Sequence, residues 1–158
     1  MSKRLILAIN PGSTSTKFAL FEEDDLIFEK TLRHSAEELK DFAKIYDQFH
    51  FRRDLIMKEL AERCIDFTRI SAIVGRGGLV KPIESGVYEV NEKMKHDLTT
   101  GVLWEHASNL GGLIADDIAS SLPDAKAYIV DPVVVESFSL WQEYQAILLL
   151  NGFQFFMP

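Results

Sequence analysis

Apolar residues near the start of the chain are grouped in short runs separated by turns, which is the pattern of β-strands. Residues 5–9 form an uninterrupted apolar run, typical of a central strand that is covered on both faces. Residues 17–21 and 26–32 form two further runs after short polar breaks. Because the links between the runs are short, they predict an antiparallel meander of three strands.

A helical spacing of apolar residues replaces this pattern from Ser35 onward. The segment Ser35-Ala36-Glu37-Glu38 is a capping box, because the serine and the second glutamate can each accept a hydrogen bond from the other's backbone N–H. It predicts a helix whose apolar stripe reaches Tyr46. Further helices are predicted over residues 52–64, 92–100 and 108–121.

Shorter apolar runs between and after these helices predict the remaining strands. Residues 70–74 form a strand that enters the glycine cluster Gly75-Arg76-Gly77-Gly78, and residues 127–130 form a final strand. Residues 87–90 are typical of a short strand or an extended arm. A meander followed by helices and further strands predicts an α/β domain with a mixed parallel and antiparallel sheet and flanking helices.

The composition excludes several classes of partner. The 158 residues are 47% hydrophobic and 26% charged, which suits a single globular domain. The 24 acidic residues outnumber the 17 basic ones, so there is no overall basic charge to attract nucleic acid or an anionic membrane. A local phosphate site is compatible with this charge, since it needs only a few backbone amides and one cation.

Cysteine usage and the lengths of the apolar runs predict a cytoplasmic protein. Cys64 is the single cysteine, so it cannot form an intrachain disulfide, and its position in a predicted helix suggests a small buried residue. The first apolar run is shorter than the roughly 7–15 residues of a secretion signal. No run approaches the ~20 apolar residues of a membrane span.

The segment 10–17 carries the strongest candidate chemistry in the sequence. Its proline–glycine pair favours a tight turn whose backbone amides can approach an oxyanion. If the chain then continues as a strand, alternation places Ser13, Ser15 and Lys17 on one side, as a cradle for a polyphosphate or its metal ion. The spacing is not that of a Walker A loop. A solvated hairpin turn rich in serine and threonine is the alternative.

The sequence INPGSTSTK at the end of the first strand resembles the adenine-nucleotide phosphate hairpin of the acetate and butyrate kinases. Three further stretches, in order along residues 74–135, resemble the butyrate kinase branch: VGRGGLVKPIESGVYEVNE, EHASNLGGLIADDIA and AYIVDPVVV. The resemblance implies the ribonuclease-H-like fold of the actin and sugar-kinase superfamily, with one actin-like ATPase domain in this chain.

The resemblance also implies an activity, the reversible transfer of a phosphoryl group between ATP and butyrate to give ADP and butyryl phosphate, with Mg²⁺. The expected partners are ATP or ADP and a short-chain carboxylate or acyl phosphate, without nucleic acid or membrane. Acetate, propionate and branched-chain fatty acids stay open as substrates. The full-length family enzyme is expected to form a homo-oligomer.

The resemblance further assigns roles to residues of the hairpin. Lys17 is expected to act in catalysis, since its ammonium offsets negative charge on the transferring phosphoryl group. Asn10 is expected to bind Mg²⁺ together with Asp131. The positions that match the phosphate- and nucleotide-binding side of the family are Asn10, Gly12, Ser13, Ser15 and Lys17.

Three further candidate residues lie in the motifs that carry the resemblance. Arg76 is expected to bind the carboxylate, because a guanidinium can hold a carboxylate bidentately; the alternative is a solvated arginine in a flexible loop. His106 is expected to donate to a phosphoryl oxygen, and otherwise caps a helix or lies in the core. Asp131 is expected to act in catalysis by orienting the attacking carboxylate or the metal, and otherwise caps the turn before Pro132.

The end of the chain differs from the rest. Residues 137–158 hold one charged residue whereas the first 136 hold 40, and six of the 17 aromatic residues lie there. We therefore expect an acetokinase-type amino-terminal domain over residues 1–135, an unrelated aromatic tail over residues 136–158, and no second family domain. A truncated, frameshifted or engineered chain would carry such a tail. The isolated 158-residue chain is expected to self-associate and to have no meaningful kinase turnover. The alternative function is that of a noncatalytic fragment that binds phosphate or nucleotide.

Overall fold

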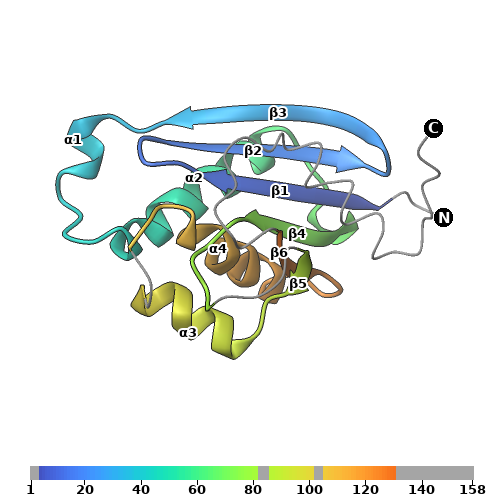
Figure 1. The fold of residues 1–158 in the computed structure, drawn as a ribbon. Helices are drawn as coiled ribbons and strands as arrows, with labels where there is room; N and C mark the ends of the chain where they lie inside the picture. Colours follow the sequence, from blue (N-terminus) through green and yellow to red (C-terminus); the bar gives the residue numbers. More distant parts are fainter. Residues whose placement is uncertain (1–3, 82–85, 102–104, 131–158) are drawn as a thin grey trace, which may run out of the picture.

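A sheet with the strand order β3-β2-β1-β4-β6-β5 runs through the computed structural model, which describes residues 4–81, 86–101 and 105–130 (Figure 1). β1 pairs antiparallel with β2 and parallel with β4, and β4 pairs parallel with β6. The predicted meander with added parallel strands is therefore confirmed. The strands span Leu5–Pro11 (β1), Ser15–Glu22 (β2), Asp25–Arg33 (β3), Ile70–Arg76 (β4), Val87–Glu89 (β5) and Lys126–Val130 (β6).

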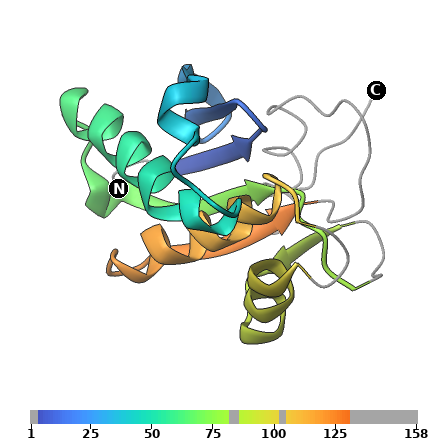
Figure 2. The same cartoon turned by 90° about the vertical axis from the view of Figure 1, so that its left-hand side faces the viewer.

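Helices α2 and α4 lie side by side and pack on one face of the sheet (Figures 1 and 2). Arg53 of α2 forms an ion pair with Asp117 of α4 at 2.7 Å, and Lys95 of α3 pairs with Asp116 of α4 at 3.0 Å. Partly exposed ion pairs contribute little stability, so apolar packing holds the layers together. The helices span Ala36–Leu39 (α1), Phe49–Glu62 (α2), Glu92–Thr100 (α3) and Asn109–Ser120 (α4), with 3₁₀ turns at Tyr46–Gln48 (η1) and Phe67–Arg69 (η2).

Side chains on the two faces of the sheet form separate apolar clusters. Leu7 and Ile9 of β1 belong to the first cluster, which includes residues of α2 and α4. Ile6 and Ala8 of β1 belong to the second cluster together with Ala19 of β2. Because strand side chains alternate, the even-numbered residues of β1 and β4 and the odd-numbered residues of β2 share this second face.

Helix α4 approaches the sheet closely because glycines face each other at the contact. A methyl group on Gly75 of β4 would lie 2.2 Å from the carbonyl carbon of Gly111. A methyl group on Gly111 would lie 2.9 Å from the carbonyl oxygen of Arg76. Backbone packs on backbone here, which only glycine permits without displacing one of the elements.

We expect Gly111→Ala to destabilise the protein by about 1–3 kcal/mol, because overpacking outweighs the gain of about 1 kcal/mol that alanine has over glycine in a helix. The free energy of unfolding, measured by chemical denaturation, gives the result. Ser120→Ala, at the exposed end of the same helix, is the control and is expected to change stability by less than about 0.5 kcal/mol. A Gly111→Ala protein that is more stable than its parent would contradict the close approach.

The first two helices differ from the sequence prediction. The capping box is confirmed, since the Ser35 N–H donates to the Glu38 carboxylate at 2.8 Å and the Glu38 N–H donates to the Ser35 hydroxyl at 3.2 Å. The helix ends at Leu39, however, so the predicted stripe to Tyr46 is wrong, and Tyr46 is 43% exposed. α2 begins at Phe49 rather than at residue 52, because Phe49 packs in the first cluster.

Cys64 lies beyond the end of α2, and the prediction of a buried helical residue is wrong. Its φ of 56° is in the left-handed region, and its side chain is exposed. The next N–H, of Ile65, donates to the carbonyl of Leu60 at 3.1 Å and closes the end of the helix. The cysteine therefore belongs to a helix-terminating turn.

Candidate functional site

The carboxyl ends of the parallel strands β1, β4 and β6 meet at one edge of the sheet. The register aligns Ile9 with Gly75, so Asn10 and Arg76 are the next residues on their strands, and the antiparallel partner of Asn10 is Lys17. By alternation, Asn10, Lys17 and Arg76 share the second face of the sheet. The topology therefore brings together the residues predicted to bind metal, phosphate and carboxylate.

The 10–17 hairpin is a tight turn followed directly by a strand. The N–H of Gly12 donates to the carbonyl of Ser15 at 2.7 Å and closes the turn. β2 begins at Ser15, so the alternation argument holds for Ser15 and Lys17, whereas Ser13 lies in the turn and is exposed. The Ser13 hydroxyl is thus presented by the turn, whereas the Ser15 hydroxyl and the Lys17 ammonium are presented by the strand.

A carboxylate on the neighbouring strand holds the Lys17 ammonium at the surface. Its Nζ lies 3.0 Å from Oε2 of Glu29 on β3, and the two side chains are 39% and 51% exposed. An exposed pair of this kind contributes only about 0–1 kcal/mol, so its replacement by a phosphate contact costs little.

Arg76 ends β4, and an ordered turn follows it. Gly77 has a φ of 69°, and a methyl group on it would lie 3.4 Å from Cβ of Ser108, just before α4. The N–H of Leu79 donates to Oδ1 of Asn109 at 2.9 Å, which ties the turn to the first residue of α4. Arg76 is half-buried at a strand end, so the alternative of an arginine in a flexible loop is not supported.

His106 lies just before α4, at the same edge of the sheet. The N–H of Ser108 donates to its Nδ1 at 3.2 Å, so Nδ1 is an acceptor and Nε2 carries the proton of the neutral ring. The Ser108 hydroxyl lies 2.9 Å from the same nitrogen. The ring is exposed and lines a cavity of about 450 Å³ between η1, the end of α3 and the start of α4. A capping contact thus leaves Nε2 as the nitrogen with which His106 could donate to an anion.

Asp131 lies outside the described residues, as do the predicted domain boundary at residue 135 and the aromatic tail over residues 136–158. Asn10 is the described member of the predicted metal pair. Among residues 4–81, 86–101 and 105–130, no group of three or more histidine, cysteine, aspartate or glutamate side chains could hold a metal ion.

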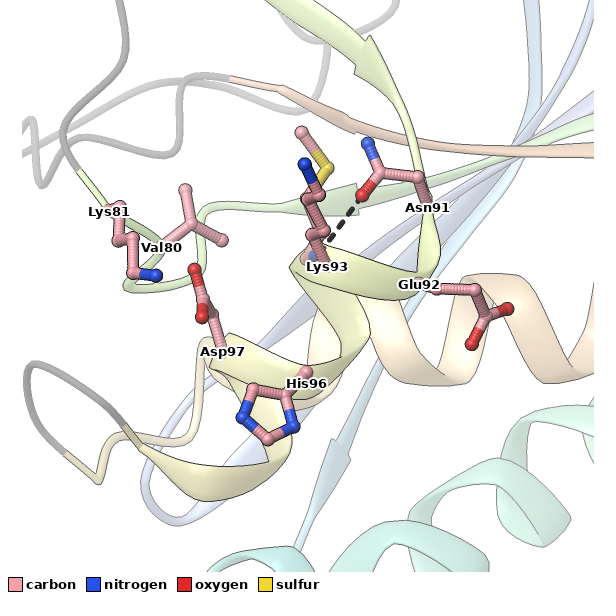
Figure 3. Close-up of a pocket in the computed structure, with 8 residues that line it drawn as sticks. Val80, Lys81, Asn91, Glu92, Lys93, His96 and Asp97 are labelled. Atoms are coloured by element: carbon pink, nitrogen blue, oxygen red, sulfur yellow. Dashed lines mark hydrogen bonds between the residues drawn. The ribbon is translucent and has the colours of Figure 1, made fainter.

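A second cavity, of about 590 Å³, lies between the segment after β4 and helix α3 (Figure 3). Lys81 and Asp97 project toward each other, while Met94 and Val80 contribute apolar surface to the lining. Asn91 is engaged in capping α3, since its Oδ1 accepts from the Met94 N–H at 3.0 Å. None of the residues predicted for the site is among the described residues that line this cavity.

Sequence reasoning missed Arg52, which lies beneath the 10–17 hairpin on the helix-covered face. Its side chain is fully buried on α2, and burial lowers the pKa of Arg52 to about 10, so the guanidinium stays charged at neutral pH. It donates to the backbone carbonyls of Gly12, Ser13 and Ser15 at 2.7, 3.0 and 2.9 Å. Gln48 Oε1 accepts from the same group at 2.8 and 3.1 Å.

One signal in the sequence could have identified Arg52. It lies four and eight residues before Ile56 and Leu60, the buried residues of α2, so it belongs to the stripe that faces the sheet. A charged residue in a buried stripe needs polar partners, and the carbonyls of a nearby turn provide them.

His34 joins the same buried network and was also missed, since the sequence around it is polar. Its Nε2 lies 2.9 Å from Oγ1 of Thr16, which accepts from Arg52 at 3.0 Å. Burial lowers the pKa of His34, the positive charge of Arg52 lowers it further, and Glu38 opposes the shift. His34 is therefore neutral in the folded protein at pH 7.

Stability is expected to fall as the pH decreases below about 6.5, the ordinary pKa of histidine. Below this pH, His34 takes up a proton in the unfolded chain but stays neutral in the folded protein, where its pKa is lower. The folded state therefore loses stability relative to the unfolded state as the pH falls toward the pKa of His34 in the folded protein. Denaturation at pH 7.5 and 5.0 measures the change. His34→Gln is expected to reduce this pH dependence, whereas His96→Gln, at an exposed position, is expected to leave it unchanged. Equal pH dependence in the parent and His34→Gln would contradict this assignment.

Curated proteins with similar sequences are butyrate kinases. The chain is 56% identical over 131 residues to butyrate kinase 1 of Clostridium acetobutylicum and 53% identical over 136 residues to a probable butyrate kinase of Clostridium botulinum. The matches cover 83% and 86% of this chain but 37% and 38% of the relatives. The chain thus spans well under half the length of these relatives. No protein-family model matches the sequence.

Solved structures show the fold. An acetate kinase from Entamoeba histolytica superposes with a TM-score of 0.50 at 15% identity, over 80% of this chain and 34% of that chain. An exopolyphosphatase from Cytophaga hutchinsonii superposes with a TM-score of 0.51 at 14% identity, over 98% of this chain and 59% of that chain. With the mixed sheet, these likenesses confirm the ribonuclease-H-like α/β fold.

The chain therefore has the fold class that the motifs predicted, an actin-like mixed α/β fold. Within this class, its matched residues are homologous to part of the butyrate kinases, as the motifs predicted. In the described part of the chain, no helix is both long and apolar enough to cross a membrane.

Proposed function

We propose that this chain forms the phosphate- and carboxylate-binding part of an acyl-carboxylate kinase, which transfers a phosphoryl group reversibly between ATP and butyrate. One observation carries the proposal: Asn10, Lys17 and Arg76 share one face at the carboxyl edge of the sheet, in a chain whose curated relatives are butyrate kinases. A polyphosphate and a carboxylate are the two anions that such a set of groups can bind next to each other.

The hairpin residues suit the phosphate side of this reaction. The amides near Gly12, the hydroxyls of Ser13 and Ser15, and the ammonium of Lys17 can each donate to phosphate oxygens. Mg²⁺ takes oxygen ligands and usually binds through one or two protein groups, substrate phosphates and water, so the amide oxygen of Asn10 fits it. Bound Mg²⁺–ATP supplies the phosphoryl group, and we assign Asp131 as the further oxygen ligand.

The remaining roles are assigned to Arg76 at the end of β4, to His106 just before α4 and to Asp131. Arg76 holds the carboxylate bidentately and aims one of its oxygens toward the phosphates on the hairpin. Asp131 orients the acceptor or the metal. His106 donates from Nε2 to a phosphoryl oxygen, since its Nδ1 is engaged as an acceptor. Donors from separate elements of the fold thus stabilise the negative charge that is spread over the transferring phosphoryl group.

The partners and the setting follow from the same proposal. The substrate is a short-chain carboxylate or its acyl phosphate, with butyrate first and acetate, propionate and branched acids as alternatives to be assayed. The relatives are longer than this chain, and we assign the adenosine pocket to a part of the fold that the described residues do not contain. A homo-oligomer and a cytoplasmic location, where ATP is available, complete the proposal.

A segment exchange tests this function. The 131-residue segment of Clostridium acetobutylicum butyrate kinase 1 that matches this chain is replaced by this chain's own residues, giving a protein called the chimera below. Trapping with hydroxylamine then measures acyl phosphate formed from Mg²⁺–ATP and each carboxylate. We expect butyryl hydroxamate at roughly 1 s⁻¹ or faster. A folded chimera that binds nucleotide and forms no hydroxamate would favour the noncatalytic alternative.

A further inference from the structure

The guanidinium of Arg52 is a buried charge, and among residues 4–81, 86–101 and 105–130 its hydrogen-bond partners are neutral. It has no exposed surface, and its acceptors are three carbonyl oxygens of the 10–17 hairpin, the Thr16 hydroxyl and the Gln48 amide oxygen. These acceptors satisfy its N–H donors without a carboxylate. The adjacent Arg53, by contrast, pairs with Asp54 and Asp117.

An uncompensated buried cation is costly, so buried charges in proteins are normally paired. The fold nevertheless places this one directly behind the turn that we assign to phosphate binding. A bound polyphosphate would bring the missing negative charge to the opposite side of the same turn. Since the interior screens charge less than water does, the attraction extends across the thin backbone layer between them.

The hydrogen bonds also fix the direction of the hairpin amides. The carbonyls of Gly12 and Ser13 point toward Arg52. In a planar trans peptide the N–H points opposite to the C=O, so the N–H groups of Ser13 and Thr14 point away from Arg52. The carbonyl of Thr14 is engaged separately, since it accepts from the His34 N–H at 2.9 Å. The guanidinium therefore presents successive amide donors on the outer side of the turn.

We propose that Arg52 is a positioning residue that presets the 10–17 hairpin as an anion receptor and provides the buried positive charge behind a bound phosphate. The proposal rests on the phosphate role of the hairpin in the proposed function and is independent of the carboxylate acceptor. Arg52 touches neither phosphate nor acceptor. It acts through the peptide groups that it orients and through its charge.

A purely structural role makes a different prediction. If Arg52 only holds the hairpin to α2, its replacement lowers stability, and the fraction that stays folded binds an anion as tightly as before. If Arg52 positions the receptor, the affinity of the folded protein falls as well. Arg52→Lys keeps the positive charge but loses the planar guanidinium, so this variant separates the contribution of the charge from that of the hydrogen bonds that position the hairpin.

Equilibrium dialysis of the 158-residue chain against labelled inorganic pyrophosphate tests the proposal, with circular dichroism and thermal unfolding to measure the folded fraction. We expect Arg52→Lys to raise the dissociation constant about tenfold and Arg52→Gln to raise it further. Arg53→Gln, at the neighbouring carboxylate-paired arginine, is the matched control and is expected to change it less than about twofold. Gln48→Leu, a milder change, removes the acceptor that orients the guanidinium and is expected to raise the constant severalfold.

Each result of the dialysis experiment either supports or contradicts the positioning role of Arg52. Folded Arg52→Lys and Arg52→Gln proteins that bind pyrophosphate like the parent would overturn the proposal, as would a parent chain that does not bind it. If neither Arg52 variant folds, Gln48→Leu decides, and an unchanged dissociation constant contradicts the role. Arg52-dependent binding together with an inactive chimera would refute the kinase function while leaving this inference intact.

Discussion

Replacing Lys17 by alanine in the chimera is expected to lower kcat by about a hundredfold or more, with a smaller change in KM for ATP. The ammonium gains most from the charge that develops during transfer, so its loss is felt mainly in the transition state. Exchange of its exposed Glu29 partner for phosphate costs little, as the 3.0 Å surface pair indicates. Steady-state kinetics with saturating butyrate measure the effect.

Lys126→Ala is the matched control for this variant. Lys126 is also a strand lysine paired with a glutamate, at 3.1 Å from Glu89, and its side chain is 60% exposed. We expect it to leave kcat within about twofold of the parent chimera, because an exposed pair contributes little. A Lys17→Ala chimera with the parent's kcat would remove Lys17 from the mechanism.

Arg76→Lys is expected to raise KM for butyrate about tenfold or more while KM for ATP changes little. An ammonium cannot reproduce the two parallel hydrogen bonds of a guanidinium, although it keeps the charge. Arg76 lies at the end of β4, and the turn after it is tied to the start of α4. The backbone at this position therefore cannot move to compensate for the shorter lysine side chain. Initial rates over a range of butyrate and ATP concentrations separate the two constants.

Arg63→Lys controls for the general effect of replacing arginine by lysine. Arg63 lies over the ring of Phe28, at 4.3 Å from its centroid, and remote from the carboxyl edge. We expect unchanged constants for this variant. Near-normal butyrate affinity in Arg76→Lys, or an equal loss for ATP and butyrate, would contradict the assignment of Arg76 to the carboxylate.

Where local signals are complete, the sequence was sufficient to place elements of the fold. The helix over residues 92–100 was predicted with its correct ends, because Asn91 caps its start and Gly101, with a φ of 61°, closes its end. The capping box at Ser35 was also predicted correctly. The apolar stripe after it was not, because Leu39 already ends the helix and tertiary packing directs the chain into η1 and α2.

The residues of the candidate site come from the sequence, and their roles stay predictions. The order of motifs placed Asn10, Lys17 and Arg76 near strand ends, and the parallel register explains why they share a face. The buried partners behind the hairpin could not be found in the same way. The spacing of Arg52 to Ile56 and Leu60 marks it as part of the buried stripe of α2, but the groups that surround Arg52 and His34 depend on how α2 packs near β2, which no local pattern encodes.

Single-turnover transfer of label from γ-³²P-ATP in the chimera, with Mg²⁺ and butyrate, tests the central claim most directly. The claim is that this chain's residues direct the phosphoryl group to a carboxylate, so we expect the label in butyryl phosphate and little of it in inorganic phosphate. Omission of butyrate is expected to leave the label in ATP. A folded, nucleotide-binding chimera that releases the label only as inorganic phosphate, or retains it all in ATP when butyrate is present, would contradict the account.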